Sequence, residues 1–278
     1  MKKRILVVED DAPTRVLIRG VLKRGGYQVD AAKDGVEGLK KARAKEFDLV
    51  LTDIWMPRMN GLELLGELRK EPKPLRVVVM TSDSTPATVL RAIKEQAYHY
   101  LTKPVDPKAL LEQVESAVAT EGAAGPIEVL SASRDWVELL VPCEHETADR
   151  IQSFMEKLDA DLPEEARDRV GRVFHEMLLN AIEWGGHLDP NRKVRISCLR
   201  AKRMVLYRIA DPGTGFQFED LPHAAVSYAP DQLFEHVEVR KERGLRPGGF
   251  GILMARAMVD ELIYNEAHNE VVFVKYLD

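Results

Sequence analysis

The sequence predicts an α/β protein of two domains: a doubly wound, five-stranded parallel sheet, followed by helices beside a mostly antiparallel sheet. Three observations support this prediction. At 278 residues, the chain exceeds the roughly 100–200 residues of one domain. Short β-branched runs alternate with amphipathic stretches from residue 4 to about residue 120. A small-residue stretch, EGAAGP at 121–126, then interrupts all periodicity.

Five apolar runs in the first part of the chain are expected to be strands. The stretches between them are about ten to fifteen residues long, enough for the helical crossovers that connect parallel strands. Strands that alternate with helices in this way indicate a parallel sheet with helices on both faces. The runs are Ile5–Val8, Tyr27–Ala31, Leu49–Thr52, Val77–Met80 and Tyr98–Leu101.

The second part of the chain has a different pattern. We place a linker at 122–127, between domains at 1–121 and 128–278. Strands and helices no longer alternate one to one, so a mostly antiparallel sheet with helices beside it is expected. The polar stretch 217–246 contains two prolines and is expected to be irregular. The expected strands are Trp136–Val141, Val194–Arg200, Met204–Ala210, Leu262–Tyr264 and Val271–Tyr276, and the expected helices are His145–Leu158, Glu164–Glu183 and one ending near Val259.

Composition narrows the class of protein. The net charge of −5 lacks the basic excess of a dedicated nucleic-acid binder, so DNA is not an expected target. The two cysteines, Cys143 and Cys198, form no CxxC pair and are too few for a disulfide framework. No apolar stretch approaches the roughly 20 residues of a membrane span, and the acidic run Glu9–Asp11 cuts short the only signal-like segment. We therefore expect a cytoplasmic protein without membrane association.

Polar side chains follow four of the five expected strands. Glu9 and Asp10 follow the first strand, Asp53 the third, Thr81 the fourth and Lys103 the fifth. The carboxyl ends of parallel strands form the ligand-binding edge of such a sheet. Converging carboxylates repel one another unless a hard cation such as Mg²⁺ takes their oxygens, and a lysine can balance part of the charge. Solvated strand ends are the alternative, but four strand ends in the correct order favour a site.

Three segments around these residues resemble the response-regulator receiver family. They are ILVVEDD at 5–11, LTDIWMP at 51–57 and YLTKP at 100–104, and the resemblance covers about Lys2–Thr120. It implies a flavodoxin-like fold in which Asp53 accepts a phosphoryl group from a partner histidine kinase. The implied Mg²⁺ ligands are Glu9, Asp10, Asp53 and the backbone carbonyl of Trp55.

The same resemblance implies a switch. Thr81 and Lys103 would bind the phosphoryl oxygens. Tyr100 would turn inward with Thr81 when phosphorylation adds negative charge.

Three segments of the second part indicate a nucleotide site. Helical spacing puts Glu176, Asn180 and Glu183 on one stripe of a helix. The sequence DPGTG at 211–215 ends a strand, where a carboxylate can accept a hydrogen bond from an adenine amino group. The sequence GGFG at 248–251 opens a helix and offers backbone N–H groups to phosphates. Taken singly, these segments also fit a solvated helix face, a tight turn and a helix cap.

In this order the three segments resemble the ATP-binding domain shared by gyrases, sensor histidine kinases and anti-sigma-factor serine kinases, over roughly Glu128–Asp278. The resemblance implies a two-layer α/β sandwich that binds ATP and Mg²⁺, with 217–246 as a lid. Glu176 would be the general base, Asn180 the Mg²⁺ ligand and Asp211 the adenine reader. The glycines at the nucleotide would be Gly213, Gly215, Gly249 and Gly251. The lid cations Arg240, Lys241, Arg243 and Arg246 could meet phosphate, but are expected to be a solvated charge run.

The segment before the Glu176 helix separates the branches of this superfamily. A sensor histidine kinase has a dimerising two-helix segment, whereas here the strand Trp136–Val141 leads into one helix near His145, as in the anti-sigma-factor kinases. We therefore expect a response regulator, phosphorylated on Asp53, that controls an ATP-dependent serine/threonine kinase domain. Its expected partners are an upstream histidine kinase and an anti-anti-sigma-type protein or sigma factor, and the chain could form a homodimer. The alternatives are a non-catalytic, nucleotide-gated module that binds a sigma factor or adaptor, and an atypical histidine kinase.

Overall fold

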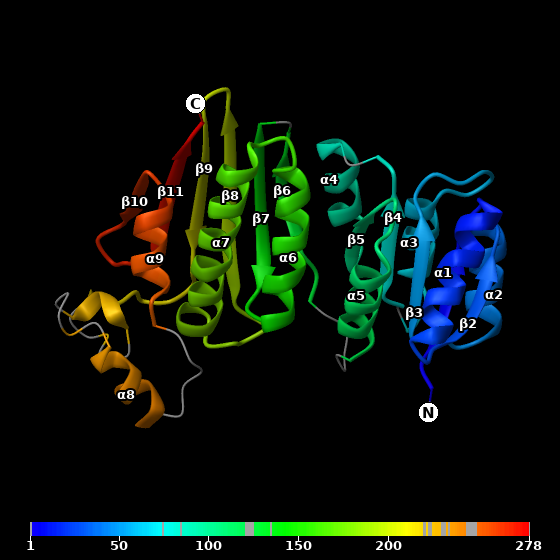
Figure 1. The fold of residues 1–278 in the computed structure, drawn as a ribbon, viewed down its shortest axis with the longest axis horizontal. Helices are drawn as coiled ribbons and strands as arrows, with labels where there is room; N and C mark the ends of the chain where they lie inside the picture. Colours follow the sequence, from blue (N-terminus) through cyan, green and yellow to red (C-terminus); the bar gives the residue numbers. More distant parts are fainter. Residues whose placement is uncertain are drawn as a thin grey trace. The chain divides into compact units, whose positions relative to one another are not determined.

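The chain forms two compact units, Met1–Ala124 and Gly125–Asp278 (Figure 1). The computed structural model describes residues 2–73, 75–83, 85–119, 125–133, 135–218, 221, 224–228, 232, 234–242 and 249–277. Several features predicted above lie outside the described residues: part of the linker (122–124), Arg243, Arg246 and Gly248.

The first unit contains a five-stranded parallel sheet in the order β2-β1-β3-β4-β5, which confirms the predicted fold class. All five predicted strands are present, with each end within one residue of its prediction. They are β1 (Arg4–Val8), β2 (Gln28–Ala32), β3 (Leu49–Asp53), β4 (Val77–Thr81) and β5 (His99–Thr102). Strands β3 and β4 are buried along their whole length, as expected of a parallel sheet covered on both faces.

Helices cover both faces of this sheet. They are α1 (Ala12–Arg24), α2 (Gly35–Ala44), α3 (Gly61–Leu68), α4 (Pro86–Lys94) and α5 (Pro107–Ala119). Neighbouring side chains of a strand point to opposite faces. Val7 accordingly belongs to the core formed with α1 and α5, whereas Val8 lies against Gly38 of α2. A capping box between Asn60 and Glu63 begins α3 and fixes the chain shortly after β3.

The second unit is a two-layer sandwich. Its six strands are all paired antiparallel, in the order β10-β11-β9-β8-β7-β6. They are β6 (Glu128–Ala132), β7 (Trp136–Pro142), β8 (Lys193–Ala201), β9 (Met204–Ala210), β10 (Glu261–Tyr264) and β11 (Glu270–Tyr276). Helices α6 (His145–Leu158), α7 (Glu164–Asn180) and α9 (Gly251–Met258) lie over one face of the sheet (Figure 1). The Phe174 ring of α7 packs 5.1 Å from that of Tyr207 on β9, which joins the two layers. Among the described residues, no helix is both long and apolar enough for a membrane span.

Three details of the second unit differ from the prediction. Strand β6 was not expected; it is a short edge strand with one hydrogen-bonded neighbour, and it carries little apolar patterning. The stretch expected to be irregular contains a 3₁₀ turn (Ala225–Ser227) and helix α8 (Glu235–Glu242). The helix expected to run to Glu183 is α-helical only to Asn180 and continues as a π-helix, Ala181–Gly185.

Candidate functional site

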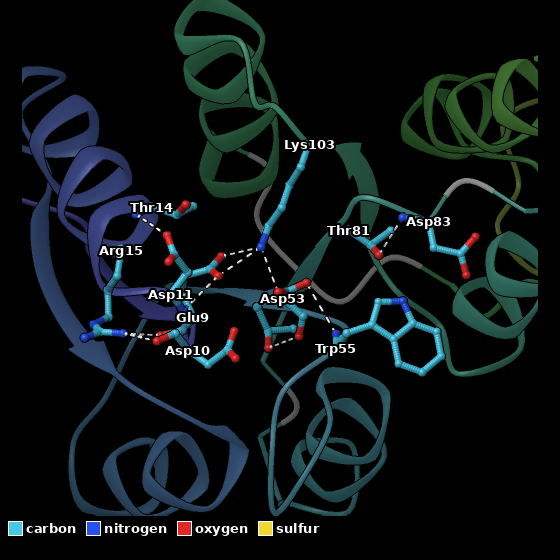
Figure 2. Close-up of polar contacts among 11 residues, drawn as sticks. Glu9, Asp10, Asp11, Thr14, Arg15, Asp53, Trp55, Thr81, Asp83 and Lys103 are labelled. Carbon is cyan, nitrogen blue, oxygen red and sulfur yellow. Dashed lines mark hydrogen bonds and ion pairs between the residues drawn. The ribbon is translucent and has the colours of Figure 1, made fainter.

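The first candidate site is a cluster of carboxylates at the carboxyl edge of the parallel sheet (Figure 2). Glu9 follows β1 and Asp53 ends β3, and these strands pair side by side, with Val8 opposite Thr52. Carboxylate oxygens of Glu9, Asp10 and Asp53 lie within 4.8 Å of one another. The structure thus brings together the three acidic side chains that the strand ends predicted.

Lys103 links two of these carboxylates. Its Nζ donates hydrogen bonds to Asp53 Oδ2 at 2.7 Å and to Glu9 Oε1 at 2.9 Å (Figure 2). Burial raises the pKa of Glu9; the hydrogen bond from Lys103 opposes that rise, and the charge of Asp53 adds to it. Burial alone would lower the pKa of Lys103, but its bonds to Asp53 and Glu9 hold the pKa above its ordinary value. The ammonium therefore stays charged beside the candidate phosphoryl acceptor.

The oxygens of this cluster fit a hard divalent cation. Glu9 is fully buried, and its Oε2 accepts no hydrogen bond, although it forms an ion pair with Lys103 at 2.7 Å. Arg15 donates to the backbone carbonyls of Glu9 and Asp10, which fixes the backbone that carries both carboxylates. The backbone amide of Trp55 donates a hydrogen bond to Asp53 Oδ1 at 3.3 Å, and Trp55 itself is 52% exposed. Carboxylate and carbonyl oxygens are the ligands that Mg²⁺ prefers.

The predicted switch residues lie on the neighbouring strands. Thr81 ends β4, is fully buried, and accepts a hydrogen bond from the Asp83 amide at 3.1 Å. Tyr100 on β5 is 1% exposed, and its hydroxyl donates to the Asp83 carbonyl. Burial raises the pKa of Tyr100, so this hydroxyl keeps its proton and remains a donor. The Tyr100 side chain is therefore turned inward in this structure.

The second candidate site is a cavity of about 420 Å³ in the second unit. It lies between the end of α7, the π-helix, the loop after β9 and the start of α9. All seven residues to which the sequence assigned a role at ATP line it: Glu176, Asn180, Asp211, Gly213, Gly215, Gly249 and Gly251.

Asp211 is held rigidly in this cavity. Its Oδ1 accepts from the Gly213 amide at 2.7 Å, and its own amide donates to the Asn269 carbonyl at 2.9 Å. Burial raises the pKa of the Asp211 carboxyl, while the Gly213 bond and the nearby Arg192 oppose the rise. A Cβ on Gly185 would lie 2.2 Å from Asp211 Oδ1, so this position requires glycine. The carboxylate is thus a fixed, partly desolvated acceptor.

The glycines of the cavity keep its walls open. Gly215 and Gly249 have φ of +86° and +96°, which other residues rarely adopt. A Cβ on Gly251 would lie 2.7 Å from Glu176 Oε2. The Glu176 carboxylate therefore faces the beginning of α9, where backbone N–H groups have no partner within the helix. The Glu176 carboxylate and the start of this helix thus meet at one wall of the cavity.

Sequence reasoning missed several lining residues. An aromatic wall is formed by Phe216, Tyr264 and His268, with ring centroids 5.3 to 5.8 Å apart. Arg240 of α8 also lines the cavity and is 7% exposed, so the expectation of a solvated charge run was wrong for this residue. Lys241 does fit that expectation, since it is exposed and pairs with Glu238 at 2.6 Å. Burial of a basic residue in a polar stretch leaves no sign in local sequence.

Two family models match the chain. They are the response regulator receiver domain, at residues 5–115, and the histidine kinase-like ATPase domain, at 141–275. The DNA-binding response regulator MtrA of Mycolicibacterium paratuberculosis is 30% identical over 205 residues, which cover 73% of this chain and 89% of MtrA. The chain belongs to the response regulators.

Other relatives of this response regulator are matched over shorter stretches. The transcriptional regulatory protein ZraR of Klebsiella oxytoca is 37% identical over 131 residues, 47% of this chain and 30% of ZraR. The solved structure of the Vibrio cholerae chemotaxis protein CheY4 is 28% identical, with 42% of this chain and 99% of CheY4 covered and a TM-score of 0.41. DNA binding and transcriptional regulation are stated in the names of those relatives.

The two domain matches have consequences for this response regulator. A receiver domain implies a phosphodonor such as a histidine kinase. An ATPase domain implies ATP binding, with which Mg²⁺ is usual.

Proposed function

We propose that this response regulator is a serine/threonine protein kinase and partner switch, controlled by phosphorylation of Asp53. Its substrate is an anti-anti-sigma-type protein, and a sigma factor is the alternative partner. The observation that carries the proposal is the convergence of Glu176, Asn180, Asp211 and the glycine turns on one cavity.

In the first unit, Asp53 is the phosphoryl acceptor. One of its oxygens attacks the phosphorus of a donor phosphohistidine, the P–N bond breaks, and the donor imidazole leaves and takes up a proton. The Lys103 ammonium already donates a hydrogen bond to Asp53 Oδ2. After the transfer, this ammonium and the Thr81 hydroxyl can both donate hydrogen bonds to the phosphoryl oxygens. Glu9, Asp10, Asp53 and the Trp55 carbonyl would hold Mg²⁺, which neutralises charge on the phosphoryl oxygens when bound.

In the second unit, Glu176 is the general base. It accepts the proton of a substrate hydroxyl whose oxygen attacks the terminal phosphorus of ATP; the bond to the bridging oxygen breaks, and ADP leaves. Asp211 accepts from the adenine amino group. Backbone N–H groups near Gly249 and Gly251 meet the phosphates. Asn180 would hold the Mg²⁺ that shields phosphate charge when bound.

Charge in the cavity supports a role for Arg240 at the terminal phosphate. The carboxylates of Glu176 and Asp211 line the cavity, as does that of Glu270, which already pairs with Arg208. Among its described lining residues, Arg240 is the one arginine or lysine. A polyphosphate placed among carboxylates needs a counter-charge, and a guanidinium binds phosphate with charge-assisted hydrogen bonds.

The test combines calorimetric ATP binding, with and without Mg²⁺, with radiolabel transfer from ATP to co-expressed anti-anti-sigma-type proteins. The proposal expects Mg²⁺-dependent binding and acid-stable phosphate on a partner serine. Glu176→Gln should abolish transfer while ATP binding persists. Binding without transfer would favour the nucleotide-gated, non-catalytic module. Acid-labile phosphate on this chain would instead indicate a histidine kinase.

Control by Asp53 needs a separate comparison. Acetyl phosphate, a small phosphodonor, is applied to the natural chain and to Asp53→Asn. The proposal expects ATP affinity or transfer to change in the natural chain and to stay constant in the variant. If acetyl phosphate changed ATP affinity and phosphate transfer equally in the natural chain and in Asp53→Asn, or changed them in neither, control by Asp53 would be contradicted.

A further inference from the structure

Helix α8 has little apolar surface to hold it in place. Its sequence is EHVEVRKE, with Glu235, Glu238, Lys241 and Glu242 exposed. A helix of eight residues is not stable by itself in water. Its position therefore depends on the contacts of its inner face.

Two side chains form the buried part of that inner face. His236 is fully buried and Arg240 is 7% exposed. They are four residues apart, so they lie on the same side of the helix, one turn from each other. Arg240 lines the cavity, and the His236 ring meets the Phe250 ring edge-on, with centroids 4.5 Å apart and an interplanar angle of 85°.

Phe250 belongs to the glycine turn of the nucleotide site. It lies between Gly249 and Gly251, lines the cavity and is 37% exposed. The Gly249 carbonyl also accepts a hydrogen bond from the Ala225 amide at 2.9 Å. The turn that would bind phosphates is thus attached to the lid stretch by this hydrogen bond and by the buried His236–Phe250 contact, and the exposed Phe234 ring also lies 5.8 Å from the Phe250 ring.

We propose that Phe250 is a positioning residue: through His236 it holds α8 against the glycine turn and so keeps Arg240 at the terminal phosphate of ATP. The inference rests on the proposed function, since it assumes ATP in this cavity. Loss of the Phe250 ring releases α8 and withdraws Arg240. ADP lacks the terminal phosphate and is affected less than ATP. Phe250 therefore determines how well the site distinguishes ATP from ADP.

The test measures the Kd of mant-ATP and mant-ADP for the full chain in the presence of Mg²⁺. In Arg240→Ala, the ratio of the ADP Kd to the ATP Kd should fall about tenfold, which corresponds to one charge-assisted hydrogen bond. Phe250→Ala should produce a similar fall. Phe250→Tyr keeps the aromatic ring, so this variant should have the same ratio as the natural chain. The double variant Arg240→Ala/Phe250→Ala should show no further fall, because both changes remove the same contact.

Two further variants separate this role from a loss of folding. His236→Ala acts on the same contact from the α8 side and should also lower the ratio. Phe234→Ala is the matched control: its ring also meets Phe250, at 5.8 Å, but it is 75% exposed where His236 is fully buried, and it does not line the cavity. It should change the ratio less than about twofold.

The proposal is overturned if Phe250→Ala and His236→Ala keep the ratio of the natural chain while Arg240→Ala lowers it. Additive effects in the double variant would overturn it as well. If Arg240→Ala leaves the ratio unchanged, the phosphate contact of Arg240 fails and the positioning role fails with it, while ATP binding itself stands. Absence of binding of either nucleotide to the natural chain would remove the proposed function.

Discussion

Asp159 is a buried carboxylate whose surroundings oppose its ionisation. It follows α6 and is 3% exposed. The Tyr207 hydroxyl donates to its Oδ2 at 2.5 Å, but its Oδ1 accepts no hydrogen bond. The Arg200 guanidinium stays 3.9 Å away and donates instead to the Leu158 carbonyl and to Asp161. Burial raises the pKa of Asp159 to about 6, although Tyr207 and Arg200 oppose the rise.

The raised pKa lowers the free energy of unfolding at neutral pH. A shift from 3.8 to about 6 corresponds to an ionisation penalty on the order of 3 kcal/mol in the folded protein at neutral pH. The folded state binds the proton more tightly than the unfolded state does. The contribution of Asp159 to the free energy of unfolding is therefore largest below about pH 4, falls as pH rises to about 6, and is constant above that.

Asp159→Asn should remove this penalty, because the amide cannot ionise and its oxygen can still accept from Tyr207. We expect the variant to be more stable than the natural chain at pH 7.5, by up to about 3 kcal/mol. The difference should shrink towards zero near pH 4. The stability difference is measured by urea unfolding at pH 4.0, 5.0, 6.0 and 7.5, followed by circular dichroism. The unfolding transition of the second unit is the one compared.

Asp161→Asn is the matched control. Asp161 also interacts with Arg200, but its side chain is 73% exposed, so its neutralisation should not stabilise the protein. A destabilised Asp159→Asn protein at pH 7.5, or a stability difference that does not depend on pH, would refute the reasoning.

Three further substitutions probe the two sites. Glu9→Gln removes a buried carboxylate from the acidic cluster, so Mg²⁺ affinity of the first unit should fall at least about tenfold, measured by calorimetry. Gly61→Ala places a Cβ 2.0 Å from the Asp53 carbonyl oxygen, and should destabilise the first unit by at least about 2 kcal/mol in urea unfolding. Gly185→Ala places a Cβ 2.2 Å from the Asp211 carboxylate, and should weaken ATP binding at least about tenfold by calorimetry.

Gly171→Ala serves as the control for both glycine substitutions. This α7 glycine has no neighbour within 4 Å of an added Cβ. Alanine there should stabilise the chain by about 0.5–1 kcal/mol and leave Mg²⁺ and ATP binding unchanged. Gly61→Ala or Gly185→Ala proteins that behave like Gly171→Ala would contradict the steric argument, and Glu9→Gln with unchanged Mg²⁺ affinity would contradict the ligand assignment.

The parallel sheet could be predicted because its strands are short, apolar and separated by amphipathic helices. Burial of β3 and β4 on both faces produces runs without alternation, which are easy to locate. The polar residues at the strand ends also mark the functional edge of such a sheet, since Glu9 and Lys103 come directly after strands. The structure brings these residues together; their chemical roles stay predictions.

The parts that could not be predicted depend on contacts between distant residues. Helix α8 has no apolar stripe, because its buried residues are His236 and Arg240, which hydropathy assigns to solvent. The pair of Asp159 and Tyr207 joins residues 48 positions apart, and neither residue has a local signal for burial beside the other. Strand β6 escapes detection because it lies at the sheet edge and exposes Leu130 to 47%.

A tryptophan belongs to each of the two candidate sites. The Trp55 backbone amide donates a hydrogen bond to Asp53 Oδ1, and Trp184 is 43% exposed and lines the cavity of the second unit. The third tryptophan of the chain, Trp136, lies on β7 and lines neither site. Trp55→Phe would leave a fluorescence signal from nucleotide occupancy, and Trp184→Phe would leave one from phosphorylation. Emission from one unlabelled sample of each variant could thus follow in time which of the two events comes first.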